Sequence, residues 1–435
     1  MENIQINNFL TINKADINLK KINIFIGPQA QGKSVIAKLI KYFKDYPTEI
    51  LKLASEGKTK RDIIKGQKVK FFKIFPQQYW ENDAFEIIYS NKHYSVCIQN
   101  KDKSSFKITI SDELTKTINK LRQITKKDMD YLIGESVNGS IIKRKKIDID
   151  TELRSTLSNE LFSAKNTKIE SVLYIPAGRS FFANLQKNVF SFLSSNIDID
   201  YFLTEFGSIY EQTKSLTSQK IFTVIGKEVP SQVNKLVEEL ICGKYSSEKG
   251  EDWITQHNKK ININNSSSGQ QESLPMALML STWPYIKTGF GRSFIIEEPE
   301  AHLFPSAQSV VVSLIANAYN RAESYCSYTI TTHSPYILSA MNNLIQAGNT
   351  LAAINSQNNN NDQKNNLFKI VPESQLIDFN DVTAYMVNNG KVIGILDSEL
   401  KILDSNEIDR ISSIFSDNFD KLIEMEFSVS EDSGE

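Results

Sequence analysis

Residues 24–40 read IFIGPQAQGKSVIAKLI, an apolar run followed by a glycine-containing loop and then by apolar residues at helical spacing. The loop matches the pattern GxxxxGK[ST], whose backbone N–H groups surround phosphates together with the positive end of the next helix. In this pattern Lys33 reaches the β- and γ-phosphates and the hydroxyl of Ser34 binds Mg²⁺. The stretch therefore predicts a strand, a phosphate loop and a helix. The predicted phosphate-binding residues are Gly27, Pro28, Gln29, Ala30, Gln31, Gly32, Lys33 and Ser34.

The size and composition of the chain limit what it can be. Its 435 residues are enough for two or three domains, or for one large interrupted domain. The 50 Lys and Arg residues balance 51 Asp and Glu residues, so any nucleic-acid surface must be local. Cys97, Cys242 and Cys326 form neither a CxxC pair nor a disulfide framework, which favours a reducing compartment. The start lacks a secretion signal and no uncharged apolar stretch reaches about 18 residues, so we predict a cytoplasmic protein that does not span a membrane.

Hydrophobic periodicity predicts the main elements. Runs of β-branched residues before position 26 indicate strands, and the helix that starts at Ser34 is expected to end at Pro47. Antiparallel strands are predicted in KVKFFKIFPQQYW (68–80) and AFEIIYSNKHYSVCI (84–98). The sequence further predicts helices in 111–164, a buried strand and loop in SVLYIPAGR (171–179), a helical region with an aromatic core in 181–237, a polar loop in 244–268, a mobile Asn-rich surface loop in 357–366 and a disordered tail in 427–435.

Three further segments carry residues suited to phosphate chemistry. The apolar strand FIIEEPE (294–300) ends in two adjacent carboxylates, of which Glu297 is expected to orient Mg²⁺ and Glu298 to accept a proton from the attacking water. Upstream, NSSSGQQE (265–272) places a hydroxyl and bare backbone N–H groups at the start of a helix, where an anion binds. Downstream, the strand YTITTHS ends in His333, in a position to contact a γ-phosphate.

The order and spacing of these four elements resemble the ABC-type ATPase heads of the SMC, RecF and OLD group. The start of the chain, QINNFLTINKADINLKKINIFIGPQAQGKS, resembles the opening of those heads, and EEPEAHLFP (297–305) is close to the IEEPExHLxP form of OLD-like bacterial defence ATPases. The resemblance covers residues 1–50 and 265–345. Three positions depart from the usual pattern of these heads. SSGQQ stands where transporters have LSGGQ, Gln29 stands where an Asn is frequent, and Glu297 stands where an Asp is usual. Each substitution keeps a group able to do the same chemistry.

The resemblance implies an α/β fold, namely a P-loop ABC-type ATPase head with an antiparallel β subregion and a helical lobe inserted between the P-loop and the signature. The expected segments are 1–110 for the N-terminal part of the head, 111–265 for the lobe returning through strand 171–179, and 266–435 for the C-terminal part. The glutamine that senses Mg²⁺ in such heads has two candidates here. One is Gln77–Gln78 and the other is the loop after LYIPAGR, which we prefer and which would bring Arg179 near the nucleotide.

The resemblance also implies that two copies close head to head on two ATP molecules. Lys33, Ser34, Glu297, Glu298 and His333 would then act within one copy. The signature residues Ser268, Gly269 and Gln270 would contact the ATP held by the other copy. ATP and Mg²⁺ are the implied ligands, and ATP binding would assemble the dimer while hydrolysis releases it.

The remaining sequence narrows the biological role. Residues 111–164 are too short for SMC arms, and no DxD follows His333 as a Toprim nuclease requires, so we expect no nuclease activity in this chain. Compact heads of this size resemble ATPase subunits of bacterial anti-phage systems of the Septu or retron-associated type. These work beside a separate effector such as an HNH or Toprim nuclease. A RecF-type DNA repair ATPase, a transporter nucleotide-binding subunit and a nucleotide-gated scaffold are the alternatives.

Direct DNA contact is an open prediction that rests on basic residues. They could line one face and bind phosphates without sequence preference, whereas the alternative is a solvated lysine-rich surface. The residues are Lys58, Lys60, Arg61, Lys65, Lys68, Lys70, Lys73 and the run 142–146 with Lys143, Arg144, Lys145 and Lys146.

Overall fold

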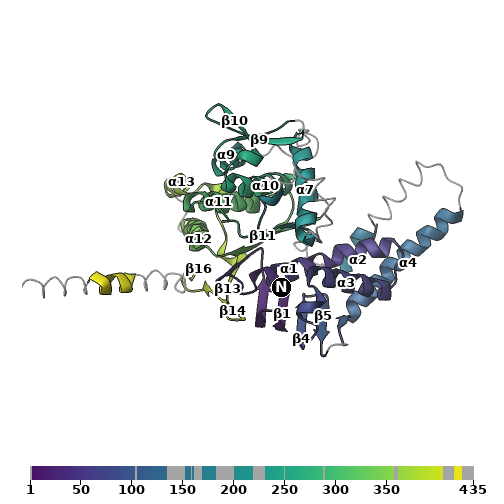
Figure 1. Ribbon diagram of the computed structural model, residues 1–435. Coiled ribbons are helices and arrows are strands. Elements are labelled where there is room, and N and C mark those ends of the chain that lie inside the picture. Colours follow the sequence, from purple (N-terminus) through teal and green to yellow (C-terminus); the bar gives the residue numbers. More distant parts are fainter. Residues whose placement is uncertain are drawn as a thin grey trace, which may run out of the picture.

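The structure, a computed structural model, describes residues 2–102, 105–134, 152–157, 159–160, 169–182, 200–218, 231–248, 250–287, 290–356, 361–404 and 416–423. Its centre is a mixed sheet with the strand order β6-β5-β4-β1-β2-β14-β13-β3-β12-β11-β7 (Figure 1). The strands are β1 (Glu2–Phe9), β2 (Ile12–Leu19), β3 (Ile22–Ile26), β4 (Phe85–Ser90), β5 (Ser95–Asn100), β6 (Lys107–Ile110), β7 (Glu170–Ile175), β11 (Gly291–Glu297), β12 (Cys326–Thr332), β13 (Val382–Asn388) and β14 (Lys391–Gly394). This arrangement confirms the predicted α/β class, with an antiparallel part in β1, β2 and β4 to β6.

The parallel part of the sheet brings distant segments to one edge. Strands β7, β11, β12, β3 and β13 run parallel, with Glu297 beside Thr331 and Thr332 beside Ile26. Because the carboxyl ends of parallel strands meet at the same edge, the residues that follow β3, β11 and β12 are neighbours. The phosphate loop, the paired glutamates and His333 therefore lie together.

Helices cover both faces of the sheet. Phe25 and Ile295 face the core that contains α1, whereas Ile24 and Ile296 face the core that contains α10, α11 and α12. This alternation is what a strand buried on both faces requires. The helices α1 and α10 thus lie on opposite faces. The helices are α1 (Lys33–Lys44), α2 (Tyr46–Ser55), α3 (Lys60–Ile74), α4 (Asp112–Gly134), α7 (Tyr201–Ser218), α9 (Ser231–Leu240), α10 (Ser268–Thr282), α11 (Pro305–Arg321), α12 (Pro335–Ser356) and α13 (Asn361–Ile370).

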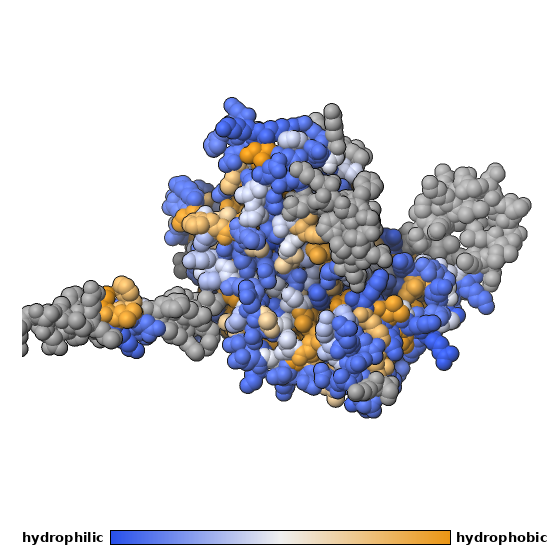
Figure 2. Space-filling view, viewed as in Figure 1, coloured by the Kyte–Doolittle hydropathy of each residue, from blue (hydrophilic) through white to orange (hydrophobic). Residues whose placement is uncertain are grey.

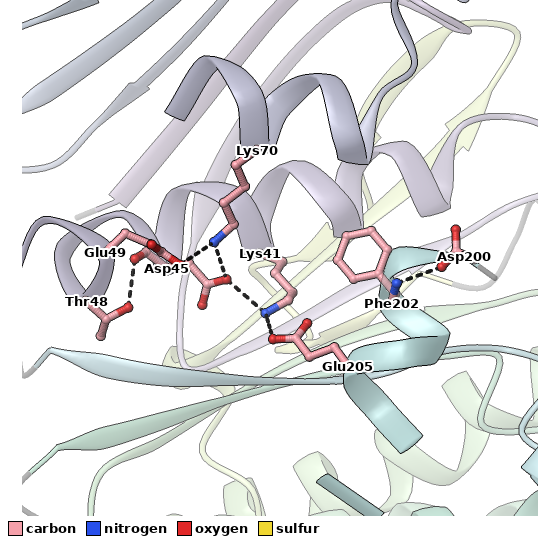
Figure 3. A network of polar contacts seen from close by, with 8 residues as sticks. All are labelled: Lys41, Asp45, Thr48, Glu49, Lys70, Asp200, Phe202 and Glu205. Carbon is pink, nitrogen blue, oxygen red and sulfur yellow. Dashed lines mark hydrogen bonds and ion pairs between the residues drawn. The ribbon is translucent and has the colours of Figure 1, made fainter. Parts of the chain in front are cut away.

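A buried ionic network fixes the phosphate-loop helix to its neighbours (Figure 3). Lys41 on α1 donates to Asp45 at 2.9 Å and to Glu205 of α7 at 3.1 Å, and Lys70 of α3 donates to Asp45 at 3.0 Å. Burial by itself would lower the pKa of Lys41, but the two carboxylates outweigh it and the pKa is raised. The charged network therefore holds α1, α3 and α7 in one arrangement.

Several predicted elements are confirmed. The antiparallel strands predicted in 84–98 are β4 and β5, the strand in 171–179 is β7, and the helix after Ser111 is α4. The aromatic residues Phe206 and Tyr210 of α7 are buried, as expected for core. In the described ranges no helix combines the length and the apolar character needed to cross a bilayer. The face of the molecule drawn in Figure 2 is mostly hydrophilic. Apolar residues are exposed on it in the region of α1 to α3, which Figure 1 labels.

The strand predicted in residues 68–80 is wrong, because most of it belongs to α3. Thr59 and Asp62 form a capping box at its start, and Ile63, Gln67, Phe71 and Ile74 are buried at helical spacing. The alternation of lysines with apolar residues in KVKFFKIF covers too few residues to reveal this period. Pro47 does not terminate a helix either, since it occupies the first turn of α2, where its missing N–H costs nothing.

Two predicted loops are also corrected. The polar segment 244–268 begins with a small antiparallel sheet of β8 (Lys244–Glu248), β9 (Glu251–Gln256) and β10 (Lys259–Asn262). The buried carboxylate of Asp252 ties it to α7 by accepting hydrogen bonds from Tyr210 and Tyr245. Residues 361–366 of the Asn-rich segment form the start of α13, which packs through Leu367.

Some predictions lie outside the described residues, namely the basic run 142–146, the tail 427–435 and residues 357–360 of the Asn-rich segment. The division of the chain into three segments at residues 110 and 265 stays a prediction. All three segments contribute to the same sheet, the middle one through β7. A two-stranded ribbon of β15 (Leu396–Asp397) and β16 (Ile402–Leu403) follows β14, with β16 against α12.

Candidate nucleotide-binding site

The phosphate loop has a backbone that only glycine satisfies at two positions. Gly27 has φ +155°, and a Cβ there would lie 2.1 Å from the carbonyl oxygen of Val387 in β13. Gly32 has φ +100°, and a Cβ there would lie 2.5 Å from the side chains of Thr11 and Ile12. The turn between β13 and β14 also holds the loop, since the N–H of Asn389 donates to Oε1 of Gln31 at 2.7 Å. The loop is therefore preformed by contacts from β1–β2 and β13–β14.

Lys33 bridges the phosphate loop and the end of β12. Its ammonium donates to the carbonyl oxygens of Gly27 at 2.8 Å and Pro28 at 2.7 Å, and it lies 3.2 Å from Nδ1 of His333. Burial lowers the pKa of Lys33 to about 8, although the carboxylates of Glu298 and Glu300 act in the opposite direction. The ammonium group of Lys33 therefore lies against the loop and is poorly hydrated.

His333 connects Lys33 to the paired glutamates. Its Nε2 lies 3.3 Å from Oε1 of Glu298, and its backbone N–H donates to Oε1 of Glu300 at 2.6 Å. A charged Lys33 can only donate, so Nδ1 of His333 accepts and Nε2 carries the proton toward Glu298. Lys33, His333 and Glu298 therefore form a continuous polar chain across the ends of β3, β12 and β11.

The two glutamates have different surroundings. Glu297 is 6% exposed, and the hydroxyl of the buried Tyr174 is the polar neighbour of its carboxylate. A buried carboxylate of this kind fits a cation ligand. Ser34, the predicted second ligand, is exposed at the start of α1. The residues present thus fit Mg²⁺ at the place the sequence predicted.

Glu298 stands in a strained backbone conformation at the end of β11. Its φ is +44°, a region that non-glycine residues rarely adopt. Its N–H donates to the carbonyl of Thr331 at 2.9 Å, and its side chain remains 39% exposed. Strain of this kind persists only where neighbours enforce it. The conformation turns the carboxylate toward His333 and solvent rather than into the sheet.

Arg179 binds the backbone of both glutamates. Its guanidinium is fully buried and donates to the carbonyl oxygens of Glu297 at 2.7 Å and Glu298 at 3.0 Å. Its Nε donates to the carbonyl of Glu272 at 3.0 Å, and the carboxylate of Glu272 accepts from the N–H groups of Arg179 and Ser180. The structure therefore places Arg179 beneath the paired glutamates, with its donors turned to backbone carbonyls.

The predicted signature lies at the start of α10. Ser267 caps the helix in a capping box with Gln270, and Ser268 is exposed. A Cβ on Gly269 would lie 2.9 Å from the carbonyl oxygen of His302, so the loop after β11 packs directly on this turn. The side chain of Gln270 serves the cap and donates to the carbonyl of Ile241 at 2.8 Å. Ser268 is thus the exposed residue at the start of α10, whereas Gly269 lies against the loop that follows β11.

Comparison with known proteins identifies the family of this chain. The family described as AAA ATPase domain matches residues 1–338. The chain belongs to the AAA ATPase domain family. No curated protein matches the sequence.

Solved structures similar to this AAA ATPase domain include three with 10% to 12% sequence identity. An SMC head bound to the C-winged helix domain of ScpA has 10% identity and a TM-score of 0.41, over 92% of this chain and 99% of that one. The SMC head domain from Thermotoga maritima has 10% identity and a TM-score of 0.35, over 90% and 97%. The recombination mediator protein RecF has 12% identity and a TM-score of 0.29, over 90% and 97%.

Glu272 was not predicted from the sequence as a site residue, although it links the helix α10 of this AAA ATPase domain to Arg179. It is 2% exposed although it is charged, and it follows the serine-glycine turn by one helical turn. A carboxylate on an otherwise apolar helix is the signal that could have indicated a buried partner. Gln77 and Gln78, the alternative for the glutamine near Mg²⁺, lie exposed in the short helix η1 (Gln77–Tyr79).

The pKa of Lys33 predicts how nucleotide binding by this AAA ATPase domain depends on pH. Phosphate binding requires the charged ammonium, and above pH 8 the free protein loses that proton. Between pH 7 and pH 9 we expect the affinity for ATP to fall about tenfold, because binding must then recover the proton. Titration calorimetry across this range measures the effect. In the variant Lys33→Arg, which stays charged, the dependence should vanish, and its persistence there would assign it to another group.

Proposed function

We propose that this chain hydrolyses ATP at a site that a second copy completes. The observation that supports it is the polar chain from Lys33 through His333 to Glu298, which ends in a partly exposed carboxylate beside the phosphate loop. A carboxylate in that place suits a general base for water attacking the γ-phosphate. Lys33 and the loop N–H groups bind the phosphates, and His333 holds the carboxylate in position.

The residues that would hold Mg²⁺ are Ser34 and Glu297. When bound, the ion supplies charge neutralisation on the phosphate oxygens. The remaining functions belong to the chain. The loop around Gly27 orients the phosphates, and Arg179 keeps Glu298 turned toward its substrate water.

The exposed N-terminus of α10 supports completion of the site by a second copy. Helices α1 and α10 lie on opposite faces of the sheet, so the P-loop and the signature turn belong to different layers. Ser268 is exposed and presents its hydroxyl at the start of this helix, where the helix dipole favours an anion. We propose that this turn binds the γ-phosphate of ATP held by a second copy, giving a head-to-head dimer with two ATP molecules.

Mixing two inactive variants tests the composite site. Lys33→Ala removes the phosphate lysine, and Ser268→Glu places a negative charge where the second copy's phosphate would lie. Each variant alone should lose at least 90% of ATP turnover, because each homodimer then has two defective sites. An equimolar mixture should recover about a quarter of wild-type turnover, since half of the dimers then contain one intact site. Phosphate release by the mixture provides the measurement.

A mixture as inactive as its components would contradict the composite site, whereas Ser268→Glu with full activity would place the whole site in one copy. Ser306→Glu, at an exposed position in the first turn of α11, is the matched control for adding a charge at a helix start and should retain activity.

For the biological role we propose control of a separately encoded effector, such as an HNH or Toprim nuclease, in cytoplasmic anti-phage defence. ATP binding would assemble the dimer and hydrolysis would release it, so the nucleotide state would set the activity of the effector. The motif EEPEAHLFP supports this proposal by its resemblance to defence ATPases. A RecF-type repair ATPase is the second candidate. The genes next to the one that encodes this chain test the role in defence. A neighbouring gene for a nuclease or a reverse transcriptase would favour defence, and one for a membrane permease would contradict it.

DNA contact remains part of this proposal, on a smaller surface than the sequence suggested. Arg61, Lys65 and Lys68 are exposed one helical turn apart on α3, which suits contact with successive phosphates. Lys70 does not belong to that surface, because it is engaged by Asp45 and Glu49 (Figure 3).

A further inference from the structure

A groove of about 560 Å³ lies between the helices α11, α12 and α13, which Figure 1 labels. Its floor is apolar and consists of the buried side chains of Val312, Leu344, Ala347 and Leu367. At its edge stands Ile370, the last residue of α13, which is 80% exposed. The volume is within the range of about 300–1,000 Å³ that is usual for binding pockets. The groove therefore offers an apolar surface of the size that a binding partner needs.

A short helix at residues 416–423, here called the tail helix, has a matching apolar side. Phe419 and Leu422 are each 63% exposed, and Ile423 follows them. These positions are spaced i, i+3 and i+4, so they share one face of the helix. Figure 2 shows apolar surface on the tail helix, which stands apart from α11, α12 and α13 at the left of the view. Its apolar face is therefore free to pack on another surface.

A helix as short as the tail helix needs such packing to persist. Isolated helices of fewer than about 12–15 residues are marginal in water, because few hydrogen bonds repay the cost of the first turn. In proteins, the burial of an amphipathic face is what stabilises them. The preceding sequence continues the apolar spacing with Ile411 and Phe415. The tail helix is therefore expected to pack on an apolar surface.

The chain leaves the body of the protein next to the groove. Leu403 of β16 exchanges two hydrogen bonds with the side chain of Asn342 on α12, at 2.8 and 2.9 Å. Two turns further along α12, Asn349 donates to the carbonyl of Lys401 at 2.9 Å. Asn343, the residue after Asn342, lines the groove. The ribbon of β15 and β16 and the groove thus lie on adjoining sides of α12.

The tail helix is tethered closely enough to reach the groove. The chain between Asp404 and Ser416 can span up to about 40 Å when it is extended. A helix with its side chains is about 10 Å wide, so the path from one side of α12 to the next is far shorter than this tether. A short tether also keeps a segment at an effective concentration of about a millimolar. The tail helix of the same chain is therefore favoured over a free partner.

Charge favours the same pairing. Residues 405–427 contain six Asp and Glu residues against two Lys and Arg residues. Lys369 is exposed next to Ile370 at the edge of the groove, and Lys401 is exposed in the ribbon on the neighbouring side of α12. Opposite charges around an apolar contact steer the two surfaces together.

We propose that the tail helix of the same chain binds in the groove between α11, α12 and α13, with Phe419 and Leu422 inserted and Ile370 packed against them. Residues at i, i+3 and i+4 that fill an apolar channel are the usual way in which a helix binds a groove. The docking needs no nucleotide, so it goes beyond the proposed function and does not depend on it. When docked, the tail helix covers the groove and closes this face of the protein to other apolar partners.

Hydrogen exchange in the full-length chain without nucleotide tests the docking. The amides of residues 416–423 should exchange at least about tenfold more slowly than in a free peptide of the same sequence, because a docked helix opens rarely. Phe419→Ala combined with Leu422→Ala should abolish this protection. Alanine has the highest helix propensity, so the loss would report docking and not a weaker helix.

A substitution in the groove separates docking there from docking elsewhere. Ile370→Asp places a charge at the edge of the groove, where the side chain is exposed and the fold does not depend on it, and it should also abolish the protection. Ile393→Asp is the matched control, at an isoleucine of β14 that is 58% exposed, and it should leave the protection unchanged.

Three outcomes would overturn the proposal. Exchange of residues 416–423 in the wild type as fast as in the free peptide would show that the tail helix does not dock. Protection that survives Ile370→Asp would place the tail helix on another surface. Docking within one chain gives the same protection over about a hundredfold range of protein concentration, so protection that rises with concentration would assign the groove to the tail helix of a second copy.

Discussion

Glu298→Gln is expected to reduce ATP turnover at least 100-fold while ATP still binds. The amide keeps the shape of the side chain, and its oxygen can still accept from Nε2 of His333, but it cannot take a proton from water. Loss of a positioned general base typically costs about 10²- to 10⁴-fold in rate. Steady-state phosphate release measures the turnover, and calorimetry measures binding.

The same variant tests ATP as the trigger of assembly. If hydrolysis releases the dimer, Glu298→Gln should accumulate as a dimer with ATP and stay monomeric without it, which sedimentation detects. Glu399→Gln, at an exposed carboxylate away from the site, is the control and should behave like the wild type. Turnover within tenfold of the wild type in Glu298→Gln would remove Glu298 as the base. A persistently monomeric variant with bound ATP would contradict assembly by ATP.

Arg179→Met is expected to impair both stability and turnover. The substitution leaves the carboxylate of Glu272 buried beside two N–H groups but without its cation. Breaking a buried ion pair from one side typically lowers the free energy of unfolding by about 3–5 kcal/mol. The carbonyls of Glu297 and Glu298 also lose their donors, so Glu298 is no longer held at positive φ. Chemical denaturation and phosphate release measure the two effects.

A second substitution separates these two consequences. In the double variant Arg179→Met, Glu272→Gln, no unpaired charge remains, so most of the lost unfolding free energy should return. Turnover should stay low, because the donors to the carbonyls of Glu297 and Glu298 are still missing. If turnover recovers together with stability, Arg179 serves the fold alone and has no part in positioning Glu298.

The site residues could be predicted where a local pattern carries the chemistry. The loop around Lys33, the paired carboxylates at Glu297 and the exposed Ser268 each follow from short motifs whose backbone geometry is local. The structure places the loop, the carboxylates and His333 at the edge of the sheet where the parallel strands end. Their roles in catalysis stay predictions that the substitutions above test.

The buried position of Arg179 depends on residues that are distant in the chain. The resemblance placed it near the nucleotide, because the strand before it lies in chain order close to where such heads place their Mg²⁺-sensing glutamine. Whether its guanidinium faces the ligand or the protein depends on Glu272, which lies 93 residues away in the chain on another helix. No pattern around Arg179 contains that partner, so its buried position could not be predicted.

The misread elements have a similar cause. In α3, lysines next to apolar residues imitate strand alternation over a short span, and only the burial of Ile63 and Phe71 in one core reveals the helix. In 244–268, the polar sequence offers no core of its own. Its strands pair with one another, and Asp252 fixes them to α7 by accepting a hydrogen bond from Tyr210.

By itself the sequence determined the phosphate loop, the acidic strand end and the α/β class, because hydrogen bonding and backbone sterics act over a few residues. Only the tertiary structure decided that Lys33 meets His333, 300 residues away, that Arg179 clamps the backbone of Glu298, and that α11, α12 and α13 leave a groove between them. These contacts depend on strand order and on the packing of helices against both sheet faces. Such packing is set by the whole hydrophobic core, and no single segment of the chain contains it.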